Sequence, residues 1–464
     1  MKQISIFAVL VIFYLVIGVV IGTPDHNHLV LMGMMGCFQL LLSIMTWIKR
    51  GNSIVSPYII FLLALYIFSY GQSLLYPFGI ITERDLVGFQ GIKLPEVFYA
   101  QIYTMILLAF FQIGALCVNS HRESTSYASY PIDFQNRRIT YVGWILLAVS
   151  AIPYYQQLIL NYTISMMYGY NAVYEQETKI GLDNVFGILS SLFVPSLICL
   201  FVAYRKNQSM RVLVEGIVLF SIVITLLTGG RSNAVILIAL LLVMHNYLVK
   251  KFSKKALIIL AVGGYLFLSV LSYISEVRTD SHRSLSSEDI TITQNGAVSA
   301  IGEMGSSMFC LIKSQNIVPE REDYRYGKSY LYSFTTIIPN LGFWQVHPAK
   351  KEANLSVWLT QELGLSYGTG FSMCAEAYVN LGFWGGLMFF LWGYLFAKYF
   401  ERIETSSDDS NSVYIVFLLI VFWFALKLPR NSFIGFIRPL FFYALPIYWL
   451  CRGYIYKSNR KIYD

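Results

Sequence analysis

Three polar side chains recur at intervals of four residues near the start of an apolar segment late in the chain. Ser372, Glu376 and Asn380 therefore share one face of the helix that this segment predicts. A carboxylate in an otherwise apolar span is costly and is a candidate functional group. Such a group could act as a general base or acid on a substrate hydroxyl. The alternative interpretation is a polar contact that locks this helix to a neighbouring arginine.

A second candidate group consists of arginines at the ends of apolar segments. A guanidinium suits bidentate binding of phosphate, so several of these arginines around one bundle would favour an anionic substrate. Each one alone could instead extend its charge to the membrane surface, or pair with Glu276 or Asp280. The candidate arginines are Arg231, Arg278, Arg283, Arg430 and Arg438.

His347 is a further candidate base, although a lone histidine in a loop is more often a surface residue. The six cysteines include no CxxC pair, and no HExxH, Asp-rich pair or His/Cys cluster occurs. Neither a Walker A motif nor GxSxG is present. The sequence thus predicts no metal site and no cofactor.

The composition determines which kind of structure must hold these groups. The chain has 464 residues, of which 56% are hydrophobic and only 13% are charged, whereas soluble domains carry about 25% charged residues. The formal charge of +8 does not indicate nucleic-acid binding, because the basic residues form short clusters between apolar segments. We therefore expect a membrane protein.

Apolar segments long enough to cross a bilayer recur along the whole chain, since a span needs roughly 20 apolar residues. The sequence predicts an all-α bundle of about twelve spans. The first apolar segment follows Lys2 without a cleavage site and is expected to remain as a span. The predicted segments are 4–22, 28–48, 57–77, 98–118, 139–158, 184–204, 211–228, 232–249, 256–275, 372–398, 412–428 and 433–451.

The basic residues alternate between connections. One set of connections carries 19 Lys and Arg residues and the opposite set of short connections carries 7. Because positive loops stay in the cytoplasm, both termini are expected there, which agrees with an even number of spans.

One long polar segment interrupts the pattern. It divides the chain into nine spans (1–275), a loop subdomain (276–371) and three final spans with the C-terminus (372–464). Within the loop, 296–318 reads as a helix with modest apolar periodicity. The stretch 329–338 is apolar enough to lie at the membrane interface or dip into it.

With these features, the chain resembles the O-antigen polysaccharide polymerase (Wzy) family, which are GT-C-like glycosyltransferases of the bacterial inner membrane. The resemblance covers the layout of spans, the cytoplasmic ends and the large late loop. Its local motifs are Thr228-Gly-Gly-Arg231-Ser, Tyr326-Gly-Lys-Ser-Tyr330, Ile338-Pro-Asn340, Gly370-Phe-Ser…Glu376-Ala-Tyr-Val-Asn-Leu-Gly382 and Leu428-Pro-Arg430-Asn-Ser.

The related O-antigen ligases share this layout but tend to carry a His-Asn pair where the long loop enters the next span. Here that place reads Phe371-Ser372, which argues against the ligase. The same departure places less weight on a histidine and more on Glu376.

The resemblance implies two undecaprenyl-diphosphate-linked oligosaccharides, joined at the periplasmic face with release of undecaprenyl diphosphate. The five arginines would bind the diphosphate without a metal. Glu376, or His347 as the weaker candidate base, would accept the proton of the attacking hydroxyl. A chain-length regulator and a flippase of the same pathway would be partners, alongside membrane lipids. The further substrate-binding candidates are Ser372, Asn380, Tyr330 and Asn340.

Two alternative hypotheses assign the chain to other kinds of protein. A lipid-linked oligosaccharide flippase could have twelve spans, but it would need charges along a passage that reaches both sides and would normally have short loops. A structural scaffold subunit would not need arginines at one end of the bundle.

Overall fold

The computed structural model describes residues 2–87, 91–118, 132–168, 183–228, 231–253, 255–260, 262–265, 301–302, 304–338, 340, 342–365, 368–405 and 411–452. All regular structure in these ranges is helical. Ten helices within them are long and apolar enough to cross a membrane. The predicted class of a polytopic helical bundle is therefore confirmed.

The ten candidate spans coincide with ten of the twelve predicted segments. Two shorter apolar helices, Ser232–Leu248 and Lys255–Tyr265, fall on the other two. The spanning elements are α1 (Lys2–Val20), α2 (His26–Ile48), α3 (Pro57–Leu75), α5 (Leu94–Leu116), α6 (Ile132–Tyr168), α8 (Asp183–Ser190) with α9 (Phe193–Ala203), α10 (Gln208–Leu227), α17 (Met373–Leu381) with α18 (Gly385–Thr405), α19 (Ser412–Ala425), and α20 (Ile434–Pro439) with α21 (Leu445–Arg452).

Side-chain caps set where several of these helices begin. Asp25 caps α2 and Ser56 caps α3, just before a proline at its first turn. Ser372 caps α17 and Asn411 caps α19. Each cap accepts a hydrogen bond from a backbone N–H that the helix itself cannot satisfy.

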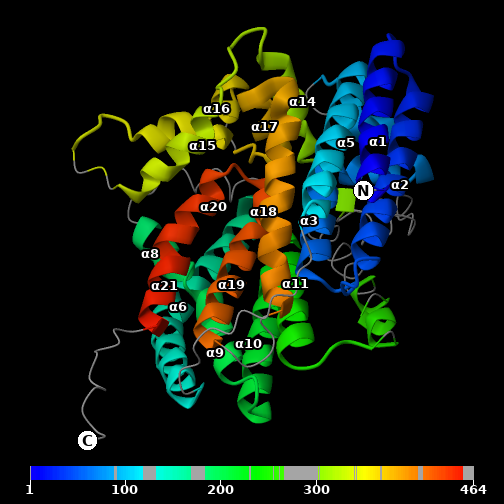
Figure 1. Cartoon of the computed structure of the whole chain (residues 1–464). Helices are drawn as coiled ribbons and strands as arrows, with labels where there is room; N and C mark the ends of the chain where they lie inside the picture. Colours follow the sequence, from blue (N-terminus) through cyan, green and yellow to red (C-terminus); the bar gives the residue numbers. More distant parts are fainter. Residues whose placement is uncertain are drawn as a thin grey trace, which may run out of the picture.

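The centre of the bundle is the packing of α5 against α18, which Figure 1 shows side by side. Glycines allow the two backbones to approach closely. A Cβ at Gly393 would collide with the Phe111 carbonyl, and one at Gly114 would collide with the Phe390 carbonyl. Small residues of this kind let membrane helices pack at short distance. This contact fixes α18, and through α17 it fixes the end at which the long loop returns.

The described part of the loop consists of short helices gathered with α17 at one end of the bundle (Figure 1). The predicted helix at 296–318 corresponds to helical residues at 301–302 and 304–305 followed by α14 (Met308–Ile317). The remaining short elements here are α15 (Lys328–Ser333), the 3-10 helix η2 (Phe334–Ile337), the π-helix η3 (Ala349–Ala353) and α16 (Leu355–Glu362).

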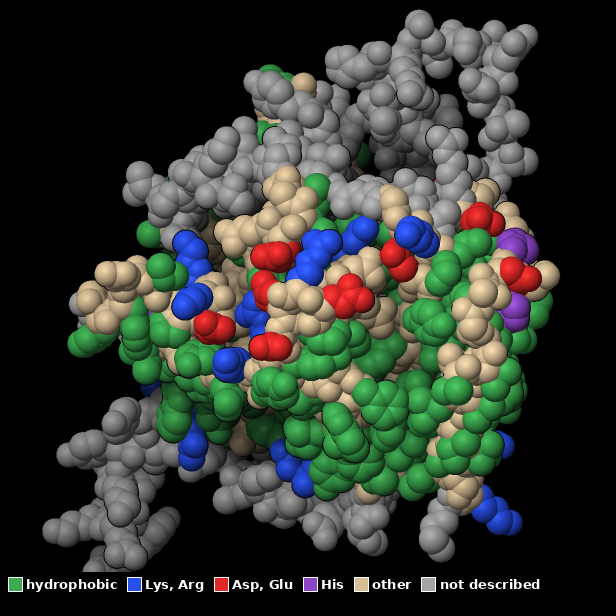
Figure 2. Space-filling view, turned by 90° about the horizontal axis from the view of Figure 1, so that it is seen from above, with side chains coloured by type: hydrophobic (Ala, Val, Ile, Leu, Met, Phe, Trp, Pro, Cys, Tyr) green, Lys and Arg blue, Asp and Glu red, His purple; other side chains and the backbone are tan. Residues whose placement is uncertain are grey.

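Seen from this end, the molecule presents a face of mixed character. Figure 2 shows acidic and basic side chains together over the middle of the face and hydrophobic side chains toward its edges. The exposed charged residues in the described part of the loop include Glu320, Arg321, Asp323 and Lys328.

Candidate active site at the return of the loop

Glu376 lies in the first turn of α17 and is only 1% exposed. Its Oε1 accepts a hydrogen bond of 2.5 Å from the Ser329 hydroxyl of α15. Its Oε2 accepts one of 2.6 Å from the backbone N–H of Phe433, just before α20. One carboxylate thus joins the loop to the beginning of the last span.

Asn380 extends this network by one helical turn. Its Nδ2 donates to the Ser329 Oγ at 2.7 Å and to the Glu376 carbonyl at 2.8 Å. Its Oδ1 accepts from the Ser329 backbone N–H at 3.3 Å. Glu376 and Asn380 are therefore on one buried face, as the spacing predicts, whereas Ser372 lies on the same stripe but serves as the helix cap.

Tyr330 lies beside this network, with its ring 5.5 Å from the ring of Phe433. Its hydroxyl is buried, and in the described part of the chain it has no hydrogen-bond partner. Burial, and after it the negative charge of Glu376, raises the pKa of Tyr330 well above its ordinary value. The hydroxyl therefore stays protonated and remains available as a hydrogen-bond donor.

Arg430 lies at the end of the 3-10 helix η5 (Leu428–Arg430) and donates to the Ser232 Oγ at 3.2 Å. Ser232 directly follows Arg231, the first residue of α11 (Arg231–Leu248). Burial raises the pKa of the Cys310 thiol of α14 to about 12, and the positive charge of Arg430 opposes this rise. The fold thus brings Arg430 to the start of α11, where the backbone of Arg231 is described and its side chain is not.

Arg325 is a central residue of the loop that the sequence did not single out. Its guanidinium lies 5.0 Å from the centre of the Trp358 ring, and Nη1 lies 3.8 Å from a Glu352 carboxylate oxygen. Its backbone N–H donates to the Val379 carbonyl of α17 at 2.9 Å. No local pattern marks this role, because the partners are distant in sequence and come together only when the loop folds.

His347 and Asn340 order the loop rather than contact Glu376. His347 Nδ1 accepts from the Ala349 N–H at 3.2 Å, which leaves Nε2 to donate to the Ile338 carbonyl at 2.9 Å. Asn340 exchanges two hydrogen bonds with the backbone of Trp344. Both imidazole nitrogens of His347 are thus engaged by backbone groups of its own loop.

Three candidate arginines remain, and only Arg438 belongs to the described part of the chain. Arg438 is exposed on α20. Arg278 and Arg283 lie outside the described residues. Within the described ranges, no group of three His, Cys, Asp or Glu side chains could hold a metal ion, and all six cysteines are free.

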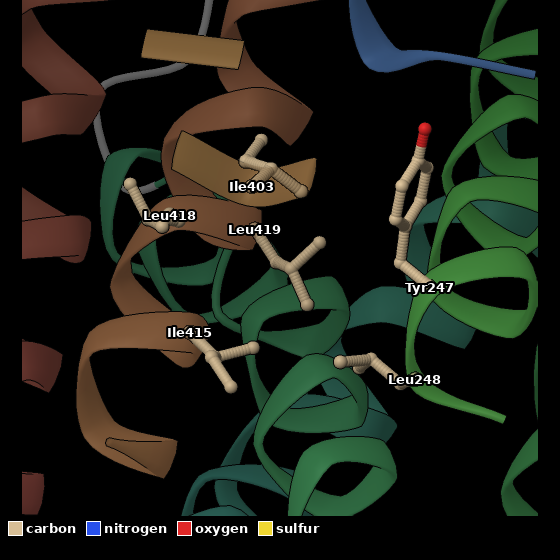
Figure 3. A pocket seen from close by; sticks show the side chains of 6 residues that line it. All are labelled: Tyr247, Leu248, Ile403, Ile415, Leu418 and Leu419. Atoms are coloured by element: carbon tan, nitrogen blue, oxygen red, sulfur yellow. The ribbon is translucent and has the colours of Figure 1, made fainter. Parts of the chain in front are cut away.

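A small apolar pocket lies far along the bundle from Glu376. Tyr247 and Leu248 end α11, Ile403 is near the end of α18, and the other lining residues belong to α19 (Figure 3). Glu376 lies near the start of the span Met373–Thr405, and Ile403 lies near its end. The Glu376 network and the pocket are therefore at opposite ends of this span. The pocket has an apolar lining with one tyrosine and supplies no acid, base or anion-binding group. The lining residues from α19 are Ile415, Leu418 and Leu419.

Of three comparisons with known proteins, one gives a match, and it covers nearly the whole chain. No curated protein and no solved structure matches it. The model of the family described as O-antigen polysaccharide polymerase Wzy matches residues 3–459. The match covers all the described spans, the loop and the buried network at its return. The chain therefore belongs to the O-antigen polysaccharide polymerase Wzy family.

Proposed function

We propose that this protein joins undecaprenyl-diphosphate-linked oligosaccharide repeats at the periplasmic face of the inner membrane. Membership of the family already implies polymerisation of O-antigen repeat units by a glycosyltransferase-type reaction. The observation that carries the finer proposal is the packing of α17, which holds Glu376, against η5, which ends at Arg430. The buried Glu376 carboxylate accepts a hydrogen bond from the backbone N–H of Phe433, which is three residues after Arg430 in the sequence. Arg430 in turn donates to Ser232, the residue that follows Arg231.

The reaction is a substitution at an anomeric carbon. A hydroxyl oxygen of one repeat forms a bond to the anomeric carbon of the other chain's first sugar. The bond from that carbon to the diphosphate oxygen breaks, and the electron pair leaves with undecaprenyl diphosphate. The proton of the attacking hydroxyl passes to the carboxylate of Glu376 as general base.

The hydrogen bond from Ser329 supports this role for Glu376. A serine hydroxyl 2.5 Å from Oε1 makes the same kind of contact that a sugar hydroxyl would make before it attacks. Glu376 is 1% exposed, so the substrate reaches it only when α15 withdraws Ser329. Tyr330, with its protonated hydroxyl, and Asn380 are then placed to donate hydrogen bonds to the sugar.

The arginines would stabilise the leaving group. A diphosphate gains negative charge as its bond to the sugar breaks, and fixed guanidinium groups in a dry site stabilise that charge without a metal. Arg430 and Arg231 are the principal candidates, because Arg430 contacts the residue that follows Arg231. Arg278, Arg283 and Arg438 are further candidates for the lipid diphosphate. His347 and Asn340 would shape the loop that reads the sugar.

The proposal includes the setting of the enzyme. Both termini lie in the cytoplasm, the loop subdomain 276–371 lies in the periplasm between spans nine and ten, and a chain-length regulator and a flippase act with it. Ser372 contributes as the cap that begins the catalytic helix.

The test is a polymer-length assay on gels with three separate variants, Arg231→Ala, Glu376→Gln and Arg430→Ala. Each is expected to lose long polymer at normal expression, because one loses the base and the others lose charge at the leaving group. In Glu376→Gln the amide oxygen can still accept the hydrogen bond from the Phe433 N–H, and the amide NH2 can donate to the Ser329 hydroxyl oxygen. The variant therefore removes the base while it keeps the size of the side chain and both contacts.

Matched controls are available on the same loop. Glu362→Gln and Arg321→Ala change exposed residues of the same types and are expected to keep normal polymer. Normal long polymer in all three site variants would overturn the site assignment. Purified protein that extends lipid-linked repeats in detergent would exclude a flippase, and transfer to a lipid A core instead of to a second repeat would indicate a ligase.

A further inference from the structure

The outer side of α15 and η2 carries large apolar side chains that remain exposed in the described part of the chain. Leu331 is 70% exposed, Phe334 is 45% exposed and Ile338 is 49% exposed. Leu331 and Phe334 are three residues apart on consecutive helical turns and so share one side of them. Ile338 directly follows the last turn, in extended conformation. A loop surface in water would normally carry polar groups at such positions.

The opposite side of the same segment is held to the bundle. Ser329, Tyr330 and Ser333 are buried, and Ser329 joins the Glu376 network. Phe334 lies at the border of the two faces: its side chain is 45% exposed, and its ring is 5.9 Å from the ring of Phe433, where the last span begins. The segment therefore has one face fixed on the membrane-spanning helices and one apolar face directed outward.

The position of α15 and η2 beside the last span indicates that lipid lies against their outward face. Figure 1 shows α15 next to the beginning of α20 and running across the direction of the spans. Along α20–α21 the side chains of Phe442 and Trp449 are 49% and 62% exposed, as expected of a surface that faces lipid. The elements α15 and η2 both pack against α20, so their apolar face lies at the end of this span.

Cationic side chains flank the same face. Lys328 begins α15, and Lys350 and Lys351 lie on η3, which packs against α15; all three are exposed. Lysines beside an apolar helical face favour the boundary between acyl chains and phosphate-bearing headgroups.

We propose that α15 and η2 form an interfacial membrane anchor, which lies flat in the bilayer with its apolar face among the upper acyl chains. The occupant of this face is lipid of the leaflet at that end of the bundle. In the conformation seen here, the anchor sets the depth at which the inner face of α15, with Ser329 and Tyr330, lies over Glu376. This inference concerns lipid contact and does not depend on the proposed reaction.

The experiment replaces single residues of the intact protein by p-benzoylphenylalanine and irradiates the protein in phospholipid nanodiscs. At Leu331, Phe334 and Ile338, mass spectrometry is expected to find phospholipid adducts, attached near the glycerol end of the acyl chain. The positive control is Phe442 on the last span, and the negative control is the exposed Glu362 of α16.

Each outcome decides the proposal. Adducts at the three loop positions in yields close to Phe442, with none at Glu362, support it. Adducts near the terminal methyl would replace the flat anchor by a re-entrant segment and overturn it. Adducts to a second copy of the chain, or none while Phe442 reacts, would also overturn it. Because three positions are tested separately, a variant that fails to fold leaves the others to decide.

Discussion

The Glu376 carboxylate accepts one hydrogen bond from the loop and another from the residue that precedes the last helix. Each donor satisfies one oxygen, so a group that would be costly in an apolar span is accommodated by its neighbours. The same satisfaction makes the carboxylate inaccessible in this conformation. At the residue scale, the proposed reaction requires Ser329 to leave Oε1 before a substrate hydroxyl can take its place.

Substitution of Ser329 separates these roles. In Ser329→Ala, Oε1 of Glu376 loses its donor, which should destabilise the folded protein by about 1–3 kcal/mol. Polymer synthesis should persist, because the serine must leave Oε1 before a sugar hydroxyl can bind. The thermal unfolding temperature and the polymer-length gel measure the two effects. Ser356→Ala is the control. The hydrogen bond from Thr360 goes to the backbone carbonyl of Ser356, so the substitution keeps it. Unchanged stability would show that the Ser329 contact does not hold the loop.

At the element scale, the position of α17 follows from the packing of α18. The continuous span that begins at Met373 and ends at Thr405 is held by α5 along the glycine contacts at Gly114 and Gly393. A shift of α18 would move the first turn of α17 and separate Glu376 from Phe433. The small residues of α18 are thus connected physically to the geometry of the site.

A larger side chain at Gly393 tests this connection. Gly393→Leu is expected to cost about 1–3 kcal/mol, because the side chain collides with the Phe111 carbonyl and a packed backbone must move. We expect a lower unfolding temperature in detergent and shorter polymer. Gly216→Leu in α10 is the matched control, since a Cβ there meets nothing within 4 Å. Equal behaviour of the two variants would contradict the role assigned to this packing.

At the scale of the whole molecule, the described candidate groups lie at one end of the bundle. Glu376, Arg430 and the start of α11 meet there, whereas the apolar pocket beside Tyr247 and Ile403 lies at the other. An enzyme that works on substrates in one leaflet needs this asymmetry, and a passage through the membrane would need polar groups along its length. The distribution of basic residues predicts which end is outside.

Reporter fusions test that orientation. Alkaline phosphatase inserted after Gly364 in the loop is expected to be active, because the enzyme folds only outside the cytoplasm. Green fluorescent protein at the C-terminus, or inserted after Gly51 between α2 and α3, is expected to fluoresce. An active phosphatase after Gly51 with an inactive one after Gly364 would invert the topology and place the site on the cytoplasmic side.

The sequence by itself determined the spans, the place of the long loop and the polar stripe that includes Glu376 and Asn380. These are local properties, since about 20 apolar residues define a span and a spacing of four defines a helical face. The family match is likewise a property of the sequence.

Only the tertiary structure decided which groups meet. The partners of Glu376 are 47 and 57 residues away, and Arg430 contacts a serine 198 residues away. The contact of the Arg325 guanidinium with the Trp358 ring likewise depends on how the loop folds. So do the hydrogen bonds of both His347 ring nitrogens with backbone groups. Such pairings follow from the packing of helices against one another, and no periodicity within a single helix encodes which other helix will lie against it.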